Sequence, residues 1–444
     1  MRGQIDCSTK RKTPTCAIKK IESPVRVNFS LVELSTFSRQ FDTMSLREKI
    51  KELNAAHREE ILSYRRHLHQ NPELSFQEVE TARFVAEKLK ALGLEVREGL
   101  GVREAHTGVC ALIKGKNPDK RVVALRADMD ALPILEKNTV DYKSKNEGVM
   151  HACGHDVHTS SLLGTAMILN ELKDSFEGTV KLIFQPGEES PPGGASLLIE
   201  DGILQNPKPD VIIGQHVWPQ IPTGMVGIAK GTFLASADMF EIAITGRGGH
   251  AAMPQFCIDP IVVSSHVVLA LQNLASRMND PLNPMVLSVC NIAGGDANNV
   301  IPNEVKLGGT LRAMNEEWRE EALKKLKGLV ASIAESFGAS SEVNIIPGYP
   351  SLFNNVELTT QVESSVASYI GKERVVEMPK AMGSEDFSFY THHVPGCFYV
   401  IGVGNPEKGI TANVHEDTFN IDEDAMTVAP GLMAWLAIEQ LGKE

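Results

Sequence analysis

The sequence lacks a long apolar run. No stretch approaches the ~18 consecutive apolar residues that a membrane-spanning helix needs. The N-terminal residues also lack the order of charged, apolar and small residues that marks a secretory signal. We therefore expect a protein that neither crosses a membrane nor is exported.

Positive charge is in deficit. Lys and Arg number 44 against 56 Asp and Glu, which gives a formal net charge of -12. Nucleic acid binding needs a basic face for the phosphates, and this balance does not supply one. We therefore expect no nucleic acid partner. The length of 444 residues and the 42% hydrophobic content are typical of a soluble enzyme with two or three domains.

Cysteine is sparse and irregularly spaced. The seven cysteines are odd in number and lack the dense spacing of a secreted disulfide framework. We interpret them as reduced thiols, which predicts a cytoplasmic protein.

Residues 1–43 differ in character from the rest of the chain. They are basic, contain Ser and Thr, and show no helical periodicity, so we expect a disordered extension. An amphipathic helix is predicted to begin near Met44, which makes Met44 an alternative translation start. An organellar transit peptide is the rival interpretation of 1–43, although the acidic residues Asp6, Glu22 and Glu33 interrupt it.

The pattern of strands and helices predicts an α/β fold with a split catalytic domain. In residues 44–230 short apolar runs alternate with helical patterns, which predicts a mostly parallel sheet with helices on both faces. Residues 231–348 follow the order β-α-β-β-α-β, which is typical of an inserted ferredoxin-like α+β domain. Residues 349–444 then return to the first domain.

Residues 150–161, MHACGHDVHTSS, concentrate metal-binding side chains. Cys153 and His155 lie two apart, so both point the same way in an extended segment, and the Gly between them permits a close bend. His151 and His158 lie nearby, and their roles stay open because a His can also line or cap the start of a helix.

Further candidate ligands follow predicted strands or lie in a polar loop. Glu188 and Glu189 follow VKLIF, His216 follows DVIIGQ, and His415 lies in TANVHEDTF. With Cys153 and His155, one Glu and these two His make five donors, more than one tetrahedral ion takes and suited to two.

Short motifs occur in the order HACGHD, QPGEE, GQHVWP, GRGGHAAMP, NVIP, GGTLRA and MGSEDFSFY. From about residue 60 to the C-terminus they resemble the dinuclear metallo-amidohydrolases of the metallopeptidase and aminoacylase family, which include aminoacylase, hippurate hydrolase and plant auxin-conjugate hydrolases. HACGHD in particular resembles the hippurate and auxin-conjugate branch.

The resemblance implies two divalent ions, a catalytic base at Glu188 and a homodimer formed through the inserted domain, which also acts as a lid. The ligands it implies are Cys153, His155, Glu189, His216 and His415. RADMDALP stands where other branches carry a His-x-Asp metal motif, so the roles of Asp128 and Asp130 stay open.

Other residues are candidates for holding the substrate. His250 follows GRGG and would stabilise an oxyanion, often in the partner's active site as the resemblance implies. Arg312 could pair with a substrate α-carboxylate, with a surface salt bridge as its competing role. Asn299 and Gly383 could donate further hydrogen bonds.

These observations predict a metal-dependent amidohydrolase that converts an N-acyl-L-amino acid to a carboxylate and a free amino acid. A dipeptidase or aminopeptidase, a non-catalytic metal-binding protein, and a thiol enzyme using Cys153 with His155 are the alternatives. Thiolate favours zinc and the resemblance adds manganese, with cobalt or nickel also compatible with imidazole and carboxylate.

Overall fold

The computed structural model describes residues 31–103 and 105–443. Residues Arg47–Glu444 form one compact unit, which contains every element described below except the first part of α1. Of the extension predicted as 1–43, residues 1–30 lie outside the described residues. No helix in the described part of the chain is long and apolar enough to cross a membrane.

Helix α1 spans Leu31–Gln70 and so begins earlier than the predicted start near Met44. The stretch from Leu31 to Met44 contains neither proline nor glycine, so nothing in it interrupts a helix. Further along, Ile61 packs against Gly164 of helix α3 (His155–Glu171), where a Cβ atom would lie 2.6 Å from the Ile61 side chain. Helix α1 is therefore fixed to the helix that begins at His155.

The largest sheet of the described chain has eight strands. Its strands, in the order β1-β2-β4-β3-β5-β16-β6-β15, are Glu95–Leu100, Gly108–Lys114, Thr179–Gln185, Val122–Asp128, Val211–Pro222, Gly396–Gly404, Val226–Ile228 and Val375–Glu377. The pairings β3–β4, β3–β5, β5–β16 and β6–β15 are parallel, and the other three are antiparallel. Strands β3 and β4 are buried along their whole length, as expected for central strands covered on both faces.

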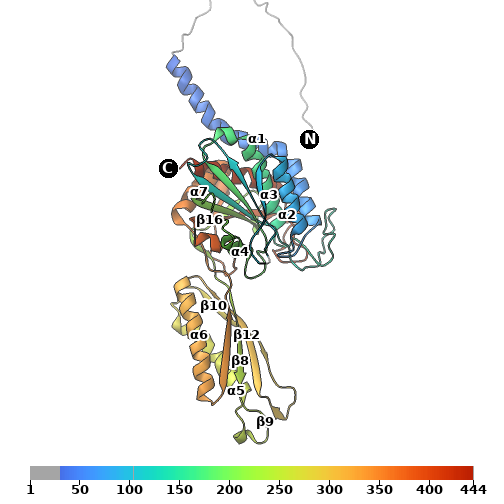
Figure 1. Cartoon of the computed structure of the whole chain (residues 1–444), viewed down its shortest axis with the longest axis vertical. Coiled ribbons are helices and arrows are strands. Elements are labelled where there is room, and N and C mark those ends of the chain that lie inside the picture. The colour runs from blue at the N-terminus through green and yellow to red at the C-terminus, as the bar shows by residue number, and fades with distance from the viewer. Residues whose placement is uncertain (1–30, 104, 444) are drawn as a thin grey trace, which may run out of the picture. The chain divides into compact units, whose positions relative to one another are not determined.

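Helices cover both faces of this sheet (Figure 1). One layer contains α2 (Val79–Ala91), α3, α7 (Val356–Ile370) and α9 (Ala429–Leu441). In this layer α2 contacts α3, and α9 contacts both α3 and α7. The other face is covered by α4 (Gly194–Glu200) and α8 (Ser388–Thr391), whose apolar side chains join a core with residues of β2, β3 and β4. The predicted α/β class is therefore confirmed.

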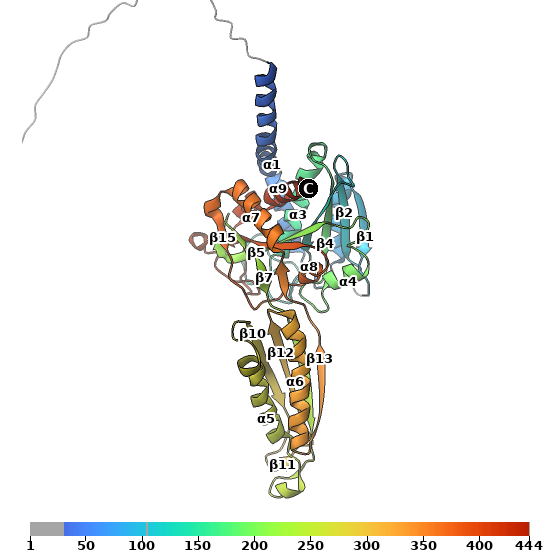
Figure 2. The ribbon, with the colours of Figure 1, turned by 90° about the vertical axis from the view of Figure 1, so that its left-hand side faces the viewer.

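A second, four-stranded antiparallel sheet is formed by strands within residues 238–346. Its strands, in the order β10-β12-β8-β13, are Met285–Ala293, Glu304–Ala313, Asp238–Thr245 and Ser340–Ile346. Helices α5 (Pro260–Asn273) and α6 (Glu316–Ser336) pack on it (Figure 2) and share a separate apolar core with it. The main elements follow the predicted β-α-β-β-α-β order, whereas 231–348 as a separate domain stays a prediction.

Helix α6 illustrates why these residues form these elements. The Asn315 side chain caps its first turn by accepting a hydrogen bond from Trp318 N, and two acidic residues follow in that turn. Its buried residues recur every four positions and face the sheet, namely Ala322, Leu326, Val330 and Ala334.

Candidate metal centre

The structure brings the five predicted ligands together at one edge of the eight-stranded sheet. They form two groups that share Cys153, and within each group the donor atoms lie within 4.8 Å of one another. One group is Cys153, His155 and His216, and the other is Cys153, Glu189 and His415. Parallel strands present their carboxyl ends at the same edge, which is why segments distant in sequence converge here.

The turn between Cys153 and His155 depends on Gly154. Its φ is +86°, in the left-handed region, and a Cβ atom there would lie 2.4 Å from Cγ2 of Val217. Glycine therefore allows the chain to pass close to β5 and to begin α3 at His155, with Cys153 directly before it.

The histidine rings are oriented by oxygen acceptors. His155 Nδ1 lies 3.2 Å from Asp130 Oδ1, and His216 Nδ1 donates to the carbonyl of Val217 at 2.7 Å. The other nitrogen of His155, Nε2, is buried and makes no hydrogen bond to a described residue, and that of His216 lies 3.5 Å from Cys153 Sγ. Metal-binding histidines commonly show this arrangement, with one nitrogen held by an oxygen and the other facing the ion.

Negative charge surrounds these rings. Burial lowers the pKa of His155, but the carboxylates of Asp128 and Asp130 outweigh it and raise this pKa to about 10. The Glu189 Oε1 atom lies 3.3 Å from His415 Nε2 and 3.9 Å from His155 Nε2. An environment that stabilises a proton on His155 also stabilises a divalent cation, so the donor set fits metal ions.

The surroundings of Cys153 are not those of a free nucleophile. Burial and the carboxylates of Glu189 and Glu188 raise the pKa of its thiol well above the usual range. A nucleophilic thiol needs a lowered pKa, so this environment counts against the alternative of a thiol enzyme.

Glu188 lies beside the ligand groups and is buried. Burial and then the neighbouring carboxylates of Glu385 and Glu189 raise its pKa well above the usual range. Its backbone carbonyl accepts a hydrogen bond from the Tyr349 hydroxyl at 2.5 Å. A carboxyl group in such surroundings can both take up and release a proton.

A cavity of about 550 Å³ opens onto this cluster. Glu188 and four of the five candidate ligands line it, together with Arg312 and Gly383. Arg312 Nη1 donates to the carbonyl of Met382 at 3.2 Å and to Ser384 Oγ at 3.4 Å, and it makes no ion pair with a described residue. The surface salt bridge considered for Arg312 is therefore not formed among these residues. Apolar residues complete the walls, among them Trp218, Leu234, Phe398 and Val414.

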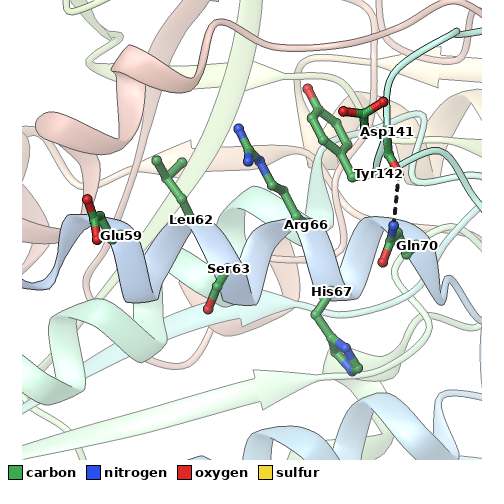
Figure 3. A pocket seen from close by; sticks show the side chains of 8 residues that line it. All are labelled: Glu59, Leu62, Ser63, Arg66, His67, Gln70, Asp141 and Tyr142. Carbon is green, nitrogen blue, oxygen red and sulfur yellow. Dashed lines mark hydrogen bonds between the residues drawn. The ribbon is translucent and has the colours of Figure 1, made fainter.

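Another cavity, of about 480 Å³, lies alongside α1 (Figure 3). The residues around it are Glu59, Leu62, Ser63, Arg66, His67, Gln70, Asp141 and Tyr142. None of the predicted site residues is among them, so the candidate site is the cavity at the sheet edge.

His250 and Asn299 are not brought to this cavity within one copy of the chain. Met239, near the start of β8, lines the cavity, whereas His250 lies in β9 (Gly249–His250) beyond the other end of β8. Eight strand residues span about 23 Å at ~3.3 Å per step. Both residues are exposed, and β9 pairs with β11 (Val300–Ile301), which directly follows Asn299. In the predicted role, His250 would have to act in the site of a partner copy.

Asp128, Asp130 and His158, whose roles the sequence left open, lie around the candidate ligands. His158 Nδ1 lies 2.6 Å from Asp128 Oδ1, and His158 Nε2 accepts a hydrogen bond from Val217 N. Arg126 Nη1 donates to Asp128 Oδ2 at 2.5 Å. The alternation of Arg126, Asp128 and Asp130 at the end of a strand was the available signal, because side chains two apart in a strand share a face.

The chain is similar to several known proteins. A family model described as peptidase family M20/M25/M40 matches residues 124–437. IAA-amino acid hydrolase ILR1-like 2 of Arabidopsis thaliana is 40% identical over 385 residues, 86% of this chain and 85% of the relative. N-acyl-L-amino acid amidohydrolase of Geobacillus stearothermophilus is 45% identical over 309 residues, 69% and 81% of the two chains.

Two further matches broaden the comparison. Thermostable carboxypeptidase 2 of Saccharolobus solfataricus is 39% identical over 398 residues, 89% of this chain and 99% of the relative. The crystal structure of Bacillus subtilis YXEP, a dinuclear metal binding peptidase, superposes with a TM-score of 0.75 at 36% identity, covering 87% of this chain and 99% of that one. The predicted family is thus confirmed, and the chain belongs to the peptidase family M20/M25/M40.

Proposed function

We propose that this protein is a metal-dependent amidohydrolase that cleaves N-acyl-L-amino acids into a carboxylate and a free amino acid. The observation that supports this most is the convergence of thiol, imidazole and carboxylate donors beside the buried carboxyl of Glu188 in one cavity. The relatives named as hydrolases of IAA-amino acids and of N-acyl-L-amino acids support the substrate class.

Five residues would hold two divalent ions, with manganese or zinc favoured over cobalt or nickel. They are Cys153, His155, Glu189, His216 and His415. Bound ions of this kind supply Lewis acidity, which lowers the pKa of a water and polarises a carbonyl.

Glu188 is the proposed base and acid. Its carboxylate takes a proton from the water as the water oxygen bonds to the amide carbon. The same group then delivers that proton to the leaving nitrogen as the carbon–nitrogen bond breaks, which yields the carboxylic acid and the free amine. Glu188 is thereby returned to its starting state.

The remaining proposed roles concern the substrate. Arg312 pairs with the α-carboxylate, which suits its position in the cavity and its lack of an ion-pair partner among the described residues. The backbone of Gly383 offers a further contact. His250 and Asn299 reach the site of a partner copy in a homodimer formed through residues 231–348, where His250 donates to the oxyanion.

The proposed location is the cytoplasm. The five cysteines among the described residues are all free thiols, which suits a reducing compartment. Import into an organelle through residues 1–43 is the alternative.

Peptide hydrolysis is the second candidate. The relative named as a carboxypeptidase favours it, since it aligns over 99% of its own length. A carboxypeptidase also cleaves an amide bond beside a free α-carboxylate, so Arg312 would serve both reactions.

The test is hydrolysis of a panel of N-acyl amino acids and short peptides by metal-loaded protein, with and without EDTA. We expect free amino acid to be released from the N-acyl substrates, and EDTA to abolish the release. Preference for peptides would favour the second candidate. Activity that survives complete metal removal would contradict both.

Two neighbouring carboxylates provide a matched pair of variants. Glu188→Gln should lower kcat by about 10²- to 10⁴-fold while metal content stays at two ions per chain. Glu189→Gln should lower the metal content itself, measured by elemental analysis after dialysis. Near-normal turnover by Glu188→Gln would rule out its proposed role.

A further inference from the structure

In the turn at 187–189 of the candidate site, three successive backbone N–H groups donate hydrogen bonds to buried carboxylates. Gly187 N donates to Glu78 Oε1 at 2.7 Å, and Glu188 N and Glu189 N donate to the two oxygens of Asp130 at 3.0 Å each. Both acceptor carboxylates are buried, with exposed fractions of 0% and 1%. The backbone of the turn that contains Glu188 and Glu189 is thus fixed by hydrogen bonds to the carboxylates of Glu78 and Asp130.

Glu78 makes two more hydrogen bonds that fix its own position. Its Oε1 atom also accepts from Phe76 N at 2.9 Å, and its Oε2 atom accepts from Thr107 Oγ1 at 2.8 Å. The ring of Phe76 lies against Gly187, where a Cβ atom would be 2.1 Å from Phe76 Cε1. A buried carboxylate is retained in a protein when such donors compensate for its lost hydration.

The position of Glu78 in the chain suggests that its side chain caps helix α2, but it does not. It directly precedes α2, yet its side chain makes no capping hydrogen bond to that helix. Glu73 caps α2 instead, by accepting from Glu80 N at 3.2 Å and from Thr81 N at 2.8 Å. Glu78 is therefore free to serve the turn at Gly187, a segment more than a hundred residues away.

We propose that Glu78 is a positioning residue that, with Asp130, sets the direction in which Glu188 and Glu189 enter the cavity. A hydrogen bond donated by a backbone N–H group fixes the plane of that peptide group. When successive peptide planes are fixed, the Cα–Cβ directions of the side chains between them are fixed as well. This inference rests on the proposed roles of Glu188 and Glu189. No direct contact of Glu78 with the substrate is required.

Hydrogen exchange tests the placement without any substrate. Glu78→Ala should speed amide exchange in the peptide that contains 187–189, because Gly187 N loses its acceptor. Glu73→Ala is the matched control, since it removes a carboxylate from the same segment but should speed exchange only at 80 and 81. Unchanged exchange at 187–189 in Glu78→Ala would overturn the inference, whatever reaction the protein catalyses.

Steady-state kinetics then separates positioning from a general loss of stability. At saturating metal, Glu78→Ala should lower kcat by about 10- to 100-fold with little change in KM, whereas Glu73→Ala should leave kcat unchanged. Glu78→Gln should recover most of the activity, because its amide oxygen can accept from Gly187 N while its NH₂ group donates to Thr107. Equal losses of kcat in the two alanine variants would contradict the inference.

A milder variant covers the case in which Glu78→Ala does not fold. Thr107→Val removes only the hydrogen bond to Glu78 Oε2, and should change exchange at 187–189 and kcat in the same direction by a smaller factor. Thr107→Ser keeps the hydroxyl and should match the wild type. A Thr107→Val protein with wild-type exchange and kcat would again overturn the inference.

Discussion

Gly187 begins the turn that carries Glu188 and Glu189, and two independent constraints require glycine there. Its φ is +60°, in the left-handed region, where a side chain costs roughly 1 to 2 kcal/mol. The ring of Phe76 also occupies the space that a Cβ atom would need. Backbone conformation and packing therefore act on the same residue.

We predict that Gly187→Ala destabilises the protein by more than the conformational cost alone and lowers kcat. Gly148→Ala is the matched control, because Gly148 has a φ of +81° but no atom within 4 Å of the added methyl group. The control should lose about 1 to 2 kcal/mol in urea unfolding and keep its activity. Equal losses in the two variants would show that the contact with Phe76 does not matter.

At the scale of elements, α1 and α3 are joined by a buried ion pair. Arg65 Nε lies 2.8 Å from Asp156 Oδ2, and both side chains have an exposed fraction of 0%. His69 adds a contact of 2.9 Å to the same oxygen. Asp156 follows His155 in the first turn of α3, so this pair holds the start of the helix that provides a proposed ligand.

We predict that Arg65→Leu lowers the free energy of unfolding by about 3 to 5 kcal/mol, because it leaves the buried charge of Asp156 without its arginine partner. Glu48→Gln serves as the control on the same helix, since its contacts with Arg47 and Lys51 are solvent-exposed. The control should change stability by less than about 1 kcal/mol. Similar urea midpoints for the two variants would contradict the prediction.

At the scale of the whole molecule, His250 lies in β9, beyond the end of β8 that is far from the cavity, and so does not act on the cavity of its own chain. A second copy is therefore part of the proposed mechanism. We predict that Glu188→Gln and His250→Ala proteins, each nearly inactive alone, recover activity when unfolded together and refolded, because mixed dimers contain one intact site.

The oligomeric state provides the matching physical measurement. Analytical ultracentrifugation of the wild type should show a dimer at concentrations where the enzyme is active. A fully active monomer, or a refolded mixture with no gain in activity, would remove His250 and Asn299 from the proposed mechanism.

The sequence by itself determined the class of fold and the kinds of donor. Alternating strand and helix patterns predicted the α/β class, because hydrophobic periodicity is a local property of the chain. The motifs around Cys153, Glu189 and His216 predicted metal-binding side chains, because thiolate, imidazole and carboxylate are suitable donors wherever the fold places them. The early start of α1 at Leu31 was not predicted, although Leu31, Leu34, Phe37 and Phe41 recur at the three- and four-residue spacing of a helix.

Only the tertiary structure decided how these donors are supported and which candidates stay apart. Glu78 and Gly187 are distant in sequence, as are His158 and Asp128, and their hydrogen bonds exist because strands β3, β4 and β5 end at one edge beneath the start of α3. The same packing leaves His250 at the opposite end of β8. Such contacts depend on how whole elements pack, which local residue preferences do not encode.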